Sequence, residues 1–149
     1  MQTIELSHFI DKNVETVYKA VCDAESYPQY INSIISVRVL ERSARTAVTA
    51  WTIEVDGIRL TWQERDEFSP ENLTVRFQMT QGDMAHYEGE WSVQPAPGGA
   101  ILGMKVSFDL GLPIISGMLQ YLLTKKVEST CREIINGIQE IAGKETISL

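Results

Sequence analysis

The chain has 149 residues, 44% of them hydrophobic and 22% charged, and it carries a formal net charge of −7. This length and composition predict one globular domain, residues 1–149, that buries a core without disulfides or metals. The acidic balance argues against nucleic acid as a partner, because phosphates are bound by basic surfaces, and no apolar run is long enough to span a bilayer.

The first third of the chain predicts one strand and two short helices. Residues Gln2–Ile10 alternate between apolar and polar side chains, which indicates a strand and not an export signal, so we expect a cytoplasmic protein. Asp11–Asn13 offers side-chain oxygens for a helix N-cap, and apolar residues follow at helical spacing as far as Val21. Pro28 suits the first turn of a second short helix, within Ser26–Ile31.

Six strands are predicted next, and one of the turns between them is specific. The pair Asp56-Gly57, between two alternating runs, is typical of a two-residue type I′ hairpin, which fixes the register of both strands. Val55 then faces Ile58, and Trp51 faces Trp62. The strands are expected over Ile34–Leu40, Ala47–Val55, Ile58–Glu67, Leu73–Thr80, His86–Val93 and Leu102–Leu110.

The hairpin register places three polar residues, Thr49, Glu64 and Asp66, on the apolar face. A buried carboxylate is costly unless it is paired or used. Among aromatic rings its pKa would be raised, so it could act as a general acid or base. The alternative is that these residues lie at an exposed end of the strands. Arg65 lies on the outward face by this count, and a one-residue bulge would turn it inward.

A long amphipathic helix is predicted from about Leu112 to Ala142, because apolar residues recur there three and four positions apart. Gly143 is the expected stop. The first third of this helix carries no charge, which indicates either a buried end or dimer contact, or the wall of an apolar cavity. In the second case, we expect ligand to enter between Tyr27–Ile31 and Leu112–Leu119.

These elements predict an α+β fold, in which one face of an antiparallel sheet carries the core. The sequence has no glycine-rich nucleotide-binding loop, and its two histidines and two cysteines lack metal-ligand spacing, so we expect no cofactor and no metal site. The inward-facing aromatic residues are either plain core or the lining of a space between the long helix and a curved sheet.

Several motifs point together to a known superfamily. They are Val17-Tyr18 with Asp23–Pro28, then Trp62–Arg65, then Gly82-Asp83 with Tyr87–Trp91, followed by the closing strand and helix. In these motifs and in its order of elements, nearly the whole chain resembles the START-like, helix-grip superfamily of polyketide cyclases/aromatases, coenzyme-Q-binding proteins and birch-pollen allergens. The resemblance implies a seven-stranded antiparallel sheet that curves around the long C-terminal helix, two short helices after the first strand, and a hydrophobic cavity.

The resemblance also implies where chemistry would occur. The bacterial aromatase/cyclases fold a poly-β-ketone in the cavity and are thought to use an arginine on the fourth strand and a tyrosine near the start of the second. That arginine matches Arg65 or, with the tryptophans aligned, falls on Asp66, and the tyrosine position falls on Ile34. The coenzyme-Q-type proteins also carry an arginine that matches Arg65, and they bind without a catalytic step.

Three functions therefore stay open. The first is a hydrophobic-ligand protein that performs aldol cyclisation and dehydration of a polyketide-like or aromatic molecule. The second is a non-enzymatic quinone or lipid carrier, and the third is a regulatory partner that docks through its apolar helix end. An acyl-carrier protein or a second copy of the chain would be the protein partner. The candidate catalytic residues are Glu64, Arg65 and Asp66, and the candidate ligand-binding residues are Tyr27, Tyr30, Ile34, Trp51, Trp62, Phe77, Tyr87, Trp91, Met104, Met118, Leu119 and Leu122.

Overall fold

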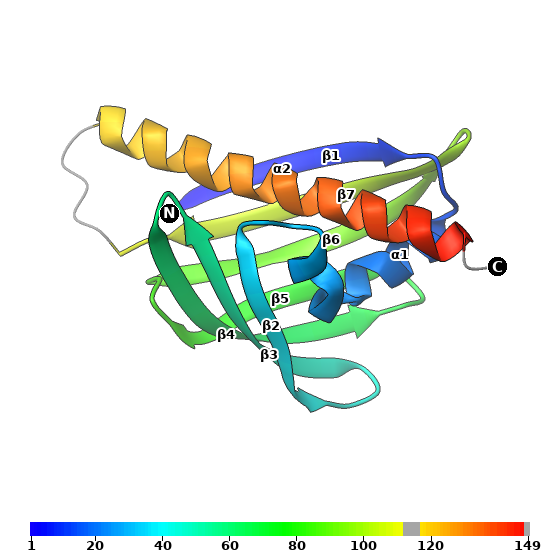
Figure 1. The fold of residues 1–149 in the computed structure, drawn as a ribbon, viewed down its shortest axis with the longest axis horizontal. Coiled ribbons are helices and arrows are strands. Elements are labelled where there is room, and N and C mark those ends of the chain that lie inside the picture. Colours follow the sequence, from blue (N-terminus) through cyan, green and yellow to red (C-terminus); the bar gives the residue numbers. More distant parts are fainter. Residues whose placement is uncertain (112–116, 148–149) are drawn as a thin grey trace.

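The computed structural model describes residues 1–111 and 117–147, with side chains as far as Lys144. One strand and two short helices are followed by six strands and a long helix, which confirms the expected order (Figure 1). The elements are β1 (Gln2–Ile10), α1 (Val14–Cys22), the 3-10 helix η1 (Ala24–Gln29), β2 (Ile34–Arg42), β3 (Thr46–Val55), β4 (Ile58–Ser69), β5 (Thr74–Gly82), β6 (His86–Ala96), β7 (Gly99–Asp109) and α2 (Gly117–Ile147).

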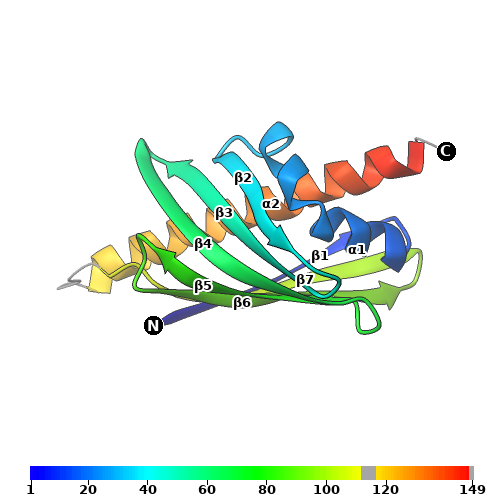
Figure 2. The same ribbon diagram turned by 90° about the horizontal axis from the view of Figure 1, so that it is seen from below.

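The seven strands form one antiparallel sheet in the order β1-β7-β6-β5-β4-β3-β2. The sheet is strongly curved, and α1, η1 and α2 all lie on its concave side (Figure 2). This arrangement confirms the predicted α+β, helix-grip fold. Each strand therefore has one face toward the helices and one toward solvent, so residues two apart share an environment.

The local signals at α1 and at the β3–β4 turn act as expected. Asn13 caps α1, because its side-chain oxygen accepts a hydrogen bond from the backbone N–H of Thr16 at 2.8 Å. At the turn, Asp56 and Gly57 have φ of 52° and 81°, the left-handed pair that a type I′ turn requires. The predicted register follows: Val55 pairs with Ile58.

Trp51 and Trp62 are cross-strand neighbours on the concave face, as predicted. Their rings stack with centroids 5.6 Å apart and an angle of 7° between the ring planes. Trp62 is buried and Trp51 is half-buried, so neither ring lies in bulk solvent.

The strand ends differ slightly from the prediction. Leu73 has a φ of 54° and belongs to the turn before β5, because the left-handed conformation cannot continue a strand. At its other end β5 continues to Gly82, and β6 continues through Pro95 to Ala96. The observed turns after β5 and after β6 are therefore shorter than the sequence predicts.

Helix α2 differs from the prediction at its C-terminal end, and its predicted start at Leu112 lies outside the described residues. The helix continues through Gly143 to Ile147, so Gly143 does not end it. Its second half packs on the core through a buried stripe with helical spacing. The stripe consists of Cys131, Ile134, Ile135, Ile138, Ile141 and Ala142.

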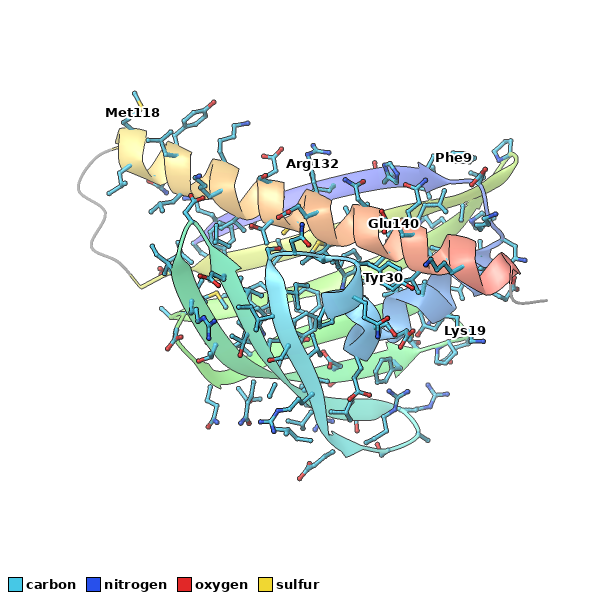
Figure 3. The ribbon with its side chains drawn as sticks, in the orientation of Figure 1. Phe9, Lys19, Tyr30, Met118, Arg132 and Glu140 are labelled. Carbon is cyan, nitrogen blue, oxygen red and sulfur yellow. The ribbon has the colours of Figure 1, made fainter. Side chains whose placement is uncertain are left out.

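The first turns of α2 border a small pocket of about 70 Å³ through Gln120, Leu123 and Thr124. They extend past the end of the sheet in both ribbon views (Figures 1 and 2). Met118 is 68% exposed and points away from the sheet (Figure 3), and Leu119 and Leu122 are also exposed. These three residues are not among those that line the cavity described below, and their role in ligand binding stays a prediction.

The structure does not bring the described parts of the expected entry route together, and residues 112–116 of that route lie outside the described residues. The segment after η1 crosses α2 at Gly137, where an added Cβ would collide with the side chain of Ile31. The ammonium of Lys144 lies 5.4 Å from the ring centre of Tyr30, which places this contact in the last third of α2. Gly137 is roughly 30 Å along the helix from Gly117, at 1.5 Å per residue.

We predict that Gly137→Ala destabilises the protein by about 1–3 kcal/mol, the usual cost of overpacking a core. Ile31 is buried, so it cannot move aside for the new methyl group. Gly143→Ala is the matched control in the same helix. Its Cβ would meet nothing within 4 Å, so it should stabilise the protein by up to about 1 kcal/mol. Urea denaturation followed by circular dichroism measures both, and equal effects would contradict the close crossing.

Candidate ligand cavity

A cavity of about 170 Å³ lies between the concave face of the sheet and the segment from the end of α1 through η1. Aromatic side chains make up much of its wall, and three polar residues of β3 and β4 interrupt them. None of the described lining residues comes from α2. The aromatic lining residues are Tyr27, Trp51, Phe68, Phe77 and Trp91, and the polar ones are Thr49, Glu64 and Asp66.

Strand β4 directs both candidate carboxyl groups into this cavity. Trp62, Glu64 and Asp66 alternate with outward-facing residues, and all three are buried. Glu64 is 4% exposed and Asp66 is 7% exposed. Thr49 pairs with Glu64 across β3, as the hairpin register predicts. The two carboxyl groups therefore lie in the interior and not at an exposed strand end.

Both carboxyl groups accept hydrogen bonds from neighbouring side chains. The indole Nε1–H of Trp51 donates to Thr49 Oγ1 at 2.9 Å, and Thr49 Oγ1 donates to Asp66 Oδ2 at 2.8 Å. Trp62 Nε1–H donates to Glu64 Oε1 at 2.8 Å. Glu64 and Asp66 share one face of β4, and each shifts the pKa of the other.

The donors fix the direction of the bonds to both carboxyl groups. An indole N–H only donates, so the hydroxyl of Thr49 accepts from Trp51 and gives its own proton to Asp66 Oδ2. That oxygen of Asp66 is therefore an acceptor, and Glu64 Oε1 accepts in the same way from Trp62. Burial raises the pKa of Glu64 well above its ordinary value, which favours the protonated form of Glu64.

The two carboxyl groups differ in their electrostatics. Burial raises the pKa of Glu64 well above its ordinary value, and the hydrogen bond and the charge of Asp66 raise it further. Burial also raises the pKa of Asp66, but the hydrogen bonds from Glu64 and Thr49 and the positive charge of Arg42 act in the opposite direction. Glu64 is the better proton donor and Asp66 the better acceptor.

Five aromatic rings form a continuous chain through the cavity wall and the core behind it. Tyr27 contacts Trp51 edge to face at 5.9 Å, and Trp51 stacks on Trp62. Tyr87 then contacts Trp62 at 5.2 Å and Phe77 at 5.3 Å. These rings surround the carboxyl pair with apolar surface, which is why burial dominates the pKa shifts. Tyr27 donates its hydroxyl proton to the carbonyl of Val21 at 2.6 Å.

Arg65 does not join Glu64 and Asp66. Its side chain is 56% exposed on the convex face, where its guanidinium lies 3.5 Å from the carboxylate of Glu67. The register shift in the β4–β5 pairing lies between Gln63 and Glu64 and leaves Arg65 facing outward. The expectation that Arg65 acts in the cavity is therefore not met.

The sequence reasoning missed an arginine that does line the cavity. A register shift in the β2–β3 pairing between Val39 and Glu41 turns Arg42 to the concave face, where it pairs with Ala47, which pairs in turn with Asp66. The guanidinium of Arg42 lies 4.5 Å from the ring centre of Phe68. Alternation along β2 gave no sign of this bulge, because the local sequence contains no glycine or proline to mark it.

The other predicted ligand residues divide into three groups. Tyr27, Trp51, Phe77 and Trp91 line the cavity, and their role in ligand binding stays a prediction. Trp62 and Tyr87 stand behind that wall, in contact with it through their rings. Ile34 and Met104 are buried in the core away from the cavity, and Tyr30 packs beside Lys144 on α2.

A metal-binding cluster and a membrane-spanning helix are both absent from the part of the chain that the structure describes. No group of three or more histidine, cysteine, aspartate or glutamate side chains there is arranged to hold a metal ion. No described helix combines the length and the apolar character needed to cross a membrane.

We predict that Glu64→Gln flattens the dependence of stability on pH. In the wild type, the unfolded chain releases the Glu64 proton near the ordinary pKa of 4.5, while the folded protein keeps it. Stability should therefore fall as pH rises above this value, by about 1.4 kcal/mol per pH unit, until the raised pKa of the folded state is reached. Glutamine has no such proton, yet it can donate to Asp66 and accept from Trp62.

Denaturant midpoints between pH 4 and pH 9 give the measurement. The control Glu140→Gln changes the net charge equally on the exposed face of α2 (Figure 3) and should keep the wild-type slope. A wild-type slope in Glu64→Gln would show that Glu64 does not retain a proton on folding.

Comparison with known proteins identifies a family that this chain matches. A family model described as polyketide cyclase / dehydrase and lipid transport matches residues 10–137. The ribosome association toxin RatA of Escherichia coli K12 is 24% identical over 95 residues, which are 64% of this chain and 60% of that protein. The chain thus matches less than two thirds of the length of this curated relative.

Solved structures resemble the chain over nearly its full length. TTHA0849 from Thermus thermophilus is 26% identical with a TM-score of 0.91, and the match covers 97% of this chain and 99% of that one. The Zhui aromatase/cyclase from Streptomyces sp. R1128 is 16% identical with a TM-score of 0.82, covers 97% and 95%, and shows the fold alone. Because the family model extends from the end of β1 into α2, the chain belongs to the polyketide cyclase / dehydrase and lipid transport family.

Proposed function

We propose that the protein binds a small, mainly aromatic or polyketide-like molecule in its cavity and closes a ring on it by aldol addition and loss of water. The observation that carries this proposal is the buried Glu64–Asp66 pair in a wall of aromatic rings, where burial raises the pKa of both carboxyl groups. A proton donor and a proton acceptor side by side are what both steps need.

The size of the cavity limits the ligand. Sites for drug-sized molecules enclose about 300–1,000 Å³, whereas an engineered protein cavity of about 150 Å³ holds one benzene molecule. The cavity of about 170 Å³ therefore fits one ring. A longer ketone chain would place its reacting segment inside and the rest outside, past the exposed residues Glu25 and Arg42 at the cavity edge.

Two steps return the pair to its starting state. In the addition, the Asp66 carboxylate takes a proton from a carbon beside a carbonyl, that carbon bonds to a second carbonyl carbon, and Glu64 protonates the resulting alkoxide. In the dehydration, the Glu64 carboxylate takes a second proton from the same carbon, the C–O bond breaks, and Asp66 gives its proton to the hydroxyl that leaves as water. The one proton is then again on Glu64.

The alternative is a quinone or lipid carrier of the coenzyme-Q-binding type. Its support is that the indole and hydroxyl donors around the carboxyl pair are already engaged with one another. The cavity volume favours the first proposal, because a lipid chain or a quinone with its tail needs more space. A protein partner, either an acyl-carrier protein or a second copy of the chain, stays a prediction. The exposed first turns of α2 are the surface on which to look for it.

We do not propose ribosome association, the property in the name of the Escherichia coli relative, for this chain. Association with a ribosome requires contact with ribosomal RNA or protein, and a net charge of −7 opposes binding to RNA phosphates.

We predict that the wild-type protein accelerates the closure of a linear heptanedione to its six-membered enone, and that Glu64→Gln lowers this rate by about 10²–10⁴-fold. Enone absorbance measures the rate. Glu140→Gln should keep wild-type activity. If the wild type gives no rate above buffer, the cyclase proposal fails. Native mass spectrometry of the freshly purified protein would then decide whether a quinone or lipid is carried.

A further inference from the structure

The cavity wall contains more carboxyl groups than basic groups. Glu64 and Asp66 are both more than nine-tenths buried, and Arg42 is the basic residue among the described residues that line the cavity. Asp66 accepts a hydrogen bond from the hydroxyl of Thr49, as a carboxylate does. In the part of the chain that the structure describes, the ion pairs involve neither Glu64 nor Asp66. A buried charge of this kind is costly unless a partner of opposite sign approaches it.

The walls around that charge also favour a cation. The rings of Tyr27, Trp51, Phe68, Phe77 and Trp91 line the cavity, and the face of an aromatic ring carries negative electrostatic potential. At the cavity edge, Phe68 already holds one cation, the guanidinium of Arg42 at 4.5 Å from its centre. The aromatic lining is an observation independent of the carboxyl pair, and it points to the same sign of ligand charge.

The cavity edge has both signs of charge. Asp23 and Glu25 line it with Arg42, so two carboxylates accompany the single guanidinium there. The carboxylate of Asp23 accepts a hydrogen bond from Ser26, and that of Glu25 from the backbone N–H of Val39, and neither bond neutralises the charge. With Asp66 inside, the lining carries an excess of negative charge, which agrees in sign with the net charge of −7 and would attract cations.

We infer that the cavity selects small apolar ligands that carry a positively charged nitrogen, as a protonated amine or a quaternary ammonium group. The nitrogen would lie against the ring faces, within reach of the field of Asp66. This inference rests on the proposed function only in using the same cavity. It would also add to that function: with Arg65 on the convex face and Arg42 at the cavity edge, the ligand's own cation would help to stabilise the charge of an enolate.

The test compares three probes of nearly equal shape and different charge. Choline carries a quaternary nitrogen, dimethylbutanol has a carbon in its place, and dimethylbutanoate is the anion of the same skeleton. We expect choline to bind the wild-type protein about tenfold more tightly than dimethylbutanol, and the anion to bind most weakly. The indole N–H signals of Trp51, Trp62 and Trp91 in NMR titrations report binding inside the cavity.

Two isosteric variants locate the charge. Asp66→Asn removes it and should abolish the preference for choline over dimethylbutanol. Glu64→Gln removes only the proton and should keep that preference. Glu140→Gln, exposed on α2, lowers the net charge equally and should also keep it. The NMR spectrum of each variant shows whether it is folded, and the wild-type comparison stands if Asp66→Asn is not.

Several results would overturn the inference: equal or tighter binding of dimethylbutanol, tighter binding of dimethylbutanoate, or a preserved preference in folded Asp66→Asn. Failure of all three probes to bind would also overturn it, because the cavity would then not admit ligands of this size. A failure of the proposed function can be told apart from a failure of this inference. Heptanedione turnover in Glu64→Gln tests the role of the Glu64 proton in catalysis, whereas the preference of that variant for choline tests the charge on Asp66.

Discussion

The register of the β3–β4 hairpin is the constraint on which the cavity depends. Asp56 and Gly57 can both adopt positive φ, so the two strands are joined by the shortest turn and cannot slip. A slip of one residue would move Glu64 and Asp66 to solvent and bring Arg65 inside. The turn therefore decides, from the far end of the hairpin, which charged side chains the core must accommodate.

The acidic pair is tolerated because its surroundings satisfy it. The hydroxyl of Thr49 donates to Asp66 and itself accepts from Trp51, and the indole N–H of Trp62 donates to Glu64. The same indole rings exclude water. Burial disfavours two ionised carboxylates side by side, which raises the pKa of both groups. One set of residues thus supplies both the low polarity that raises the pKa values and the donors that offset the cost of burial.

Family membership and site chemistry answer different questions here. The fold is shared with an aromatase/cyclase and with TTHA0849, although identity to either is at most 26%. Members of one fold carry different activities, so the function has to be argued from the residues of the cavity. In this chain those residues are a buried carboxyl pair, an aromatic wall and Arg42, without Arg65.

The sequence alone determined what depends on neighbouring residues: the strand and helix order, the type I′ turn, an N-cap within Asp11–Asn13, and the inward face of β4. These follow from dihedral preferences and alternation, which act over a few residues. The tertiary structure decided where the sheet ends under α2, so that Met118 is exposed, and where β2 bulges, so that Arg42 faces inward. Both depend on how the curved sheet and the helices fit together, and no local pattern encodes that fit.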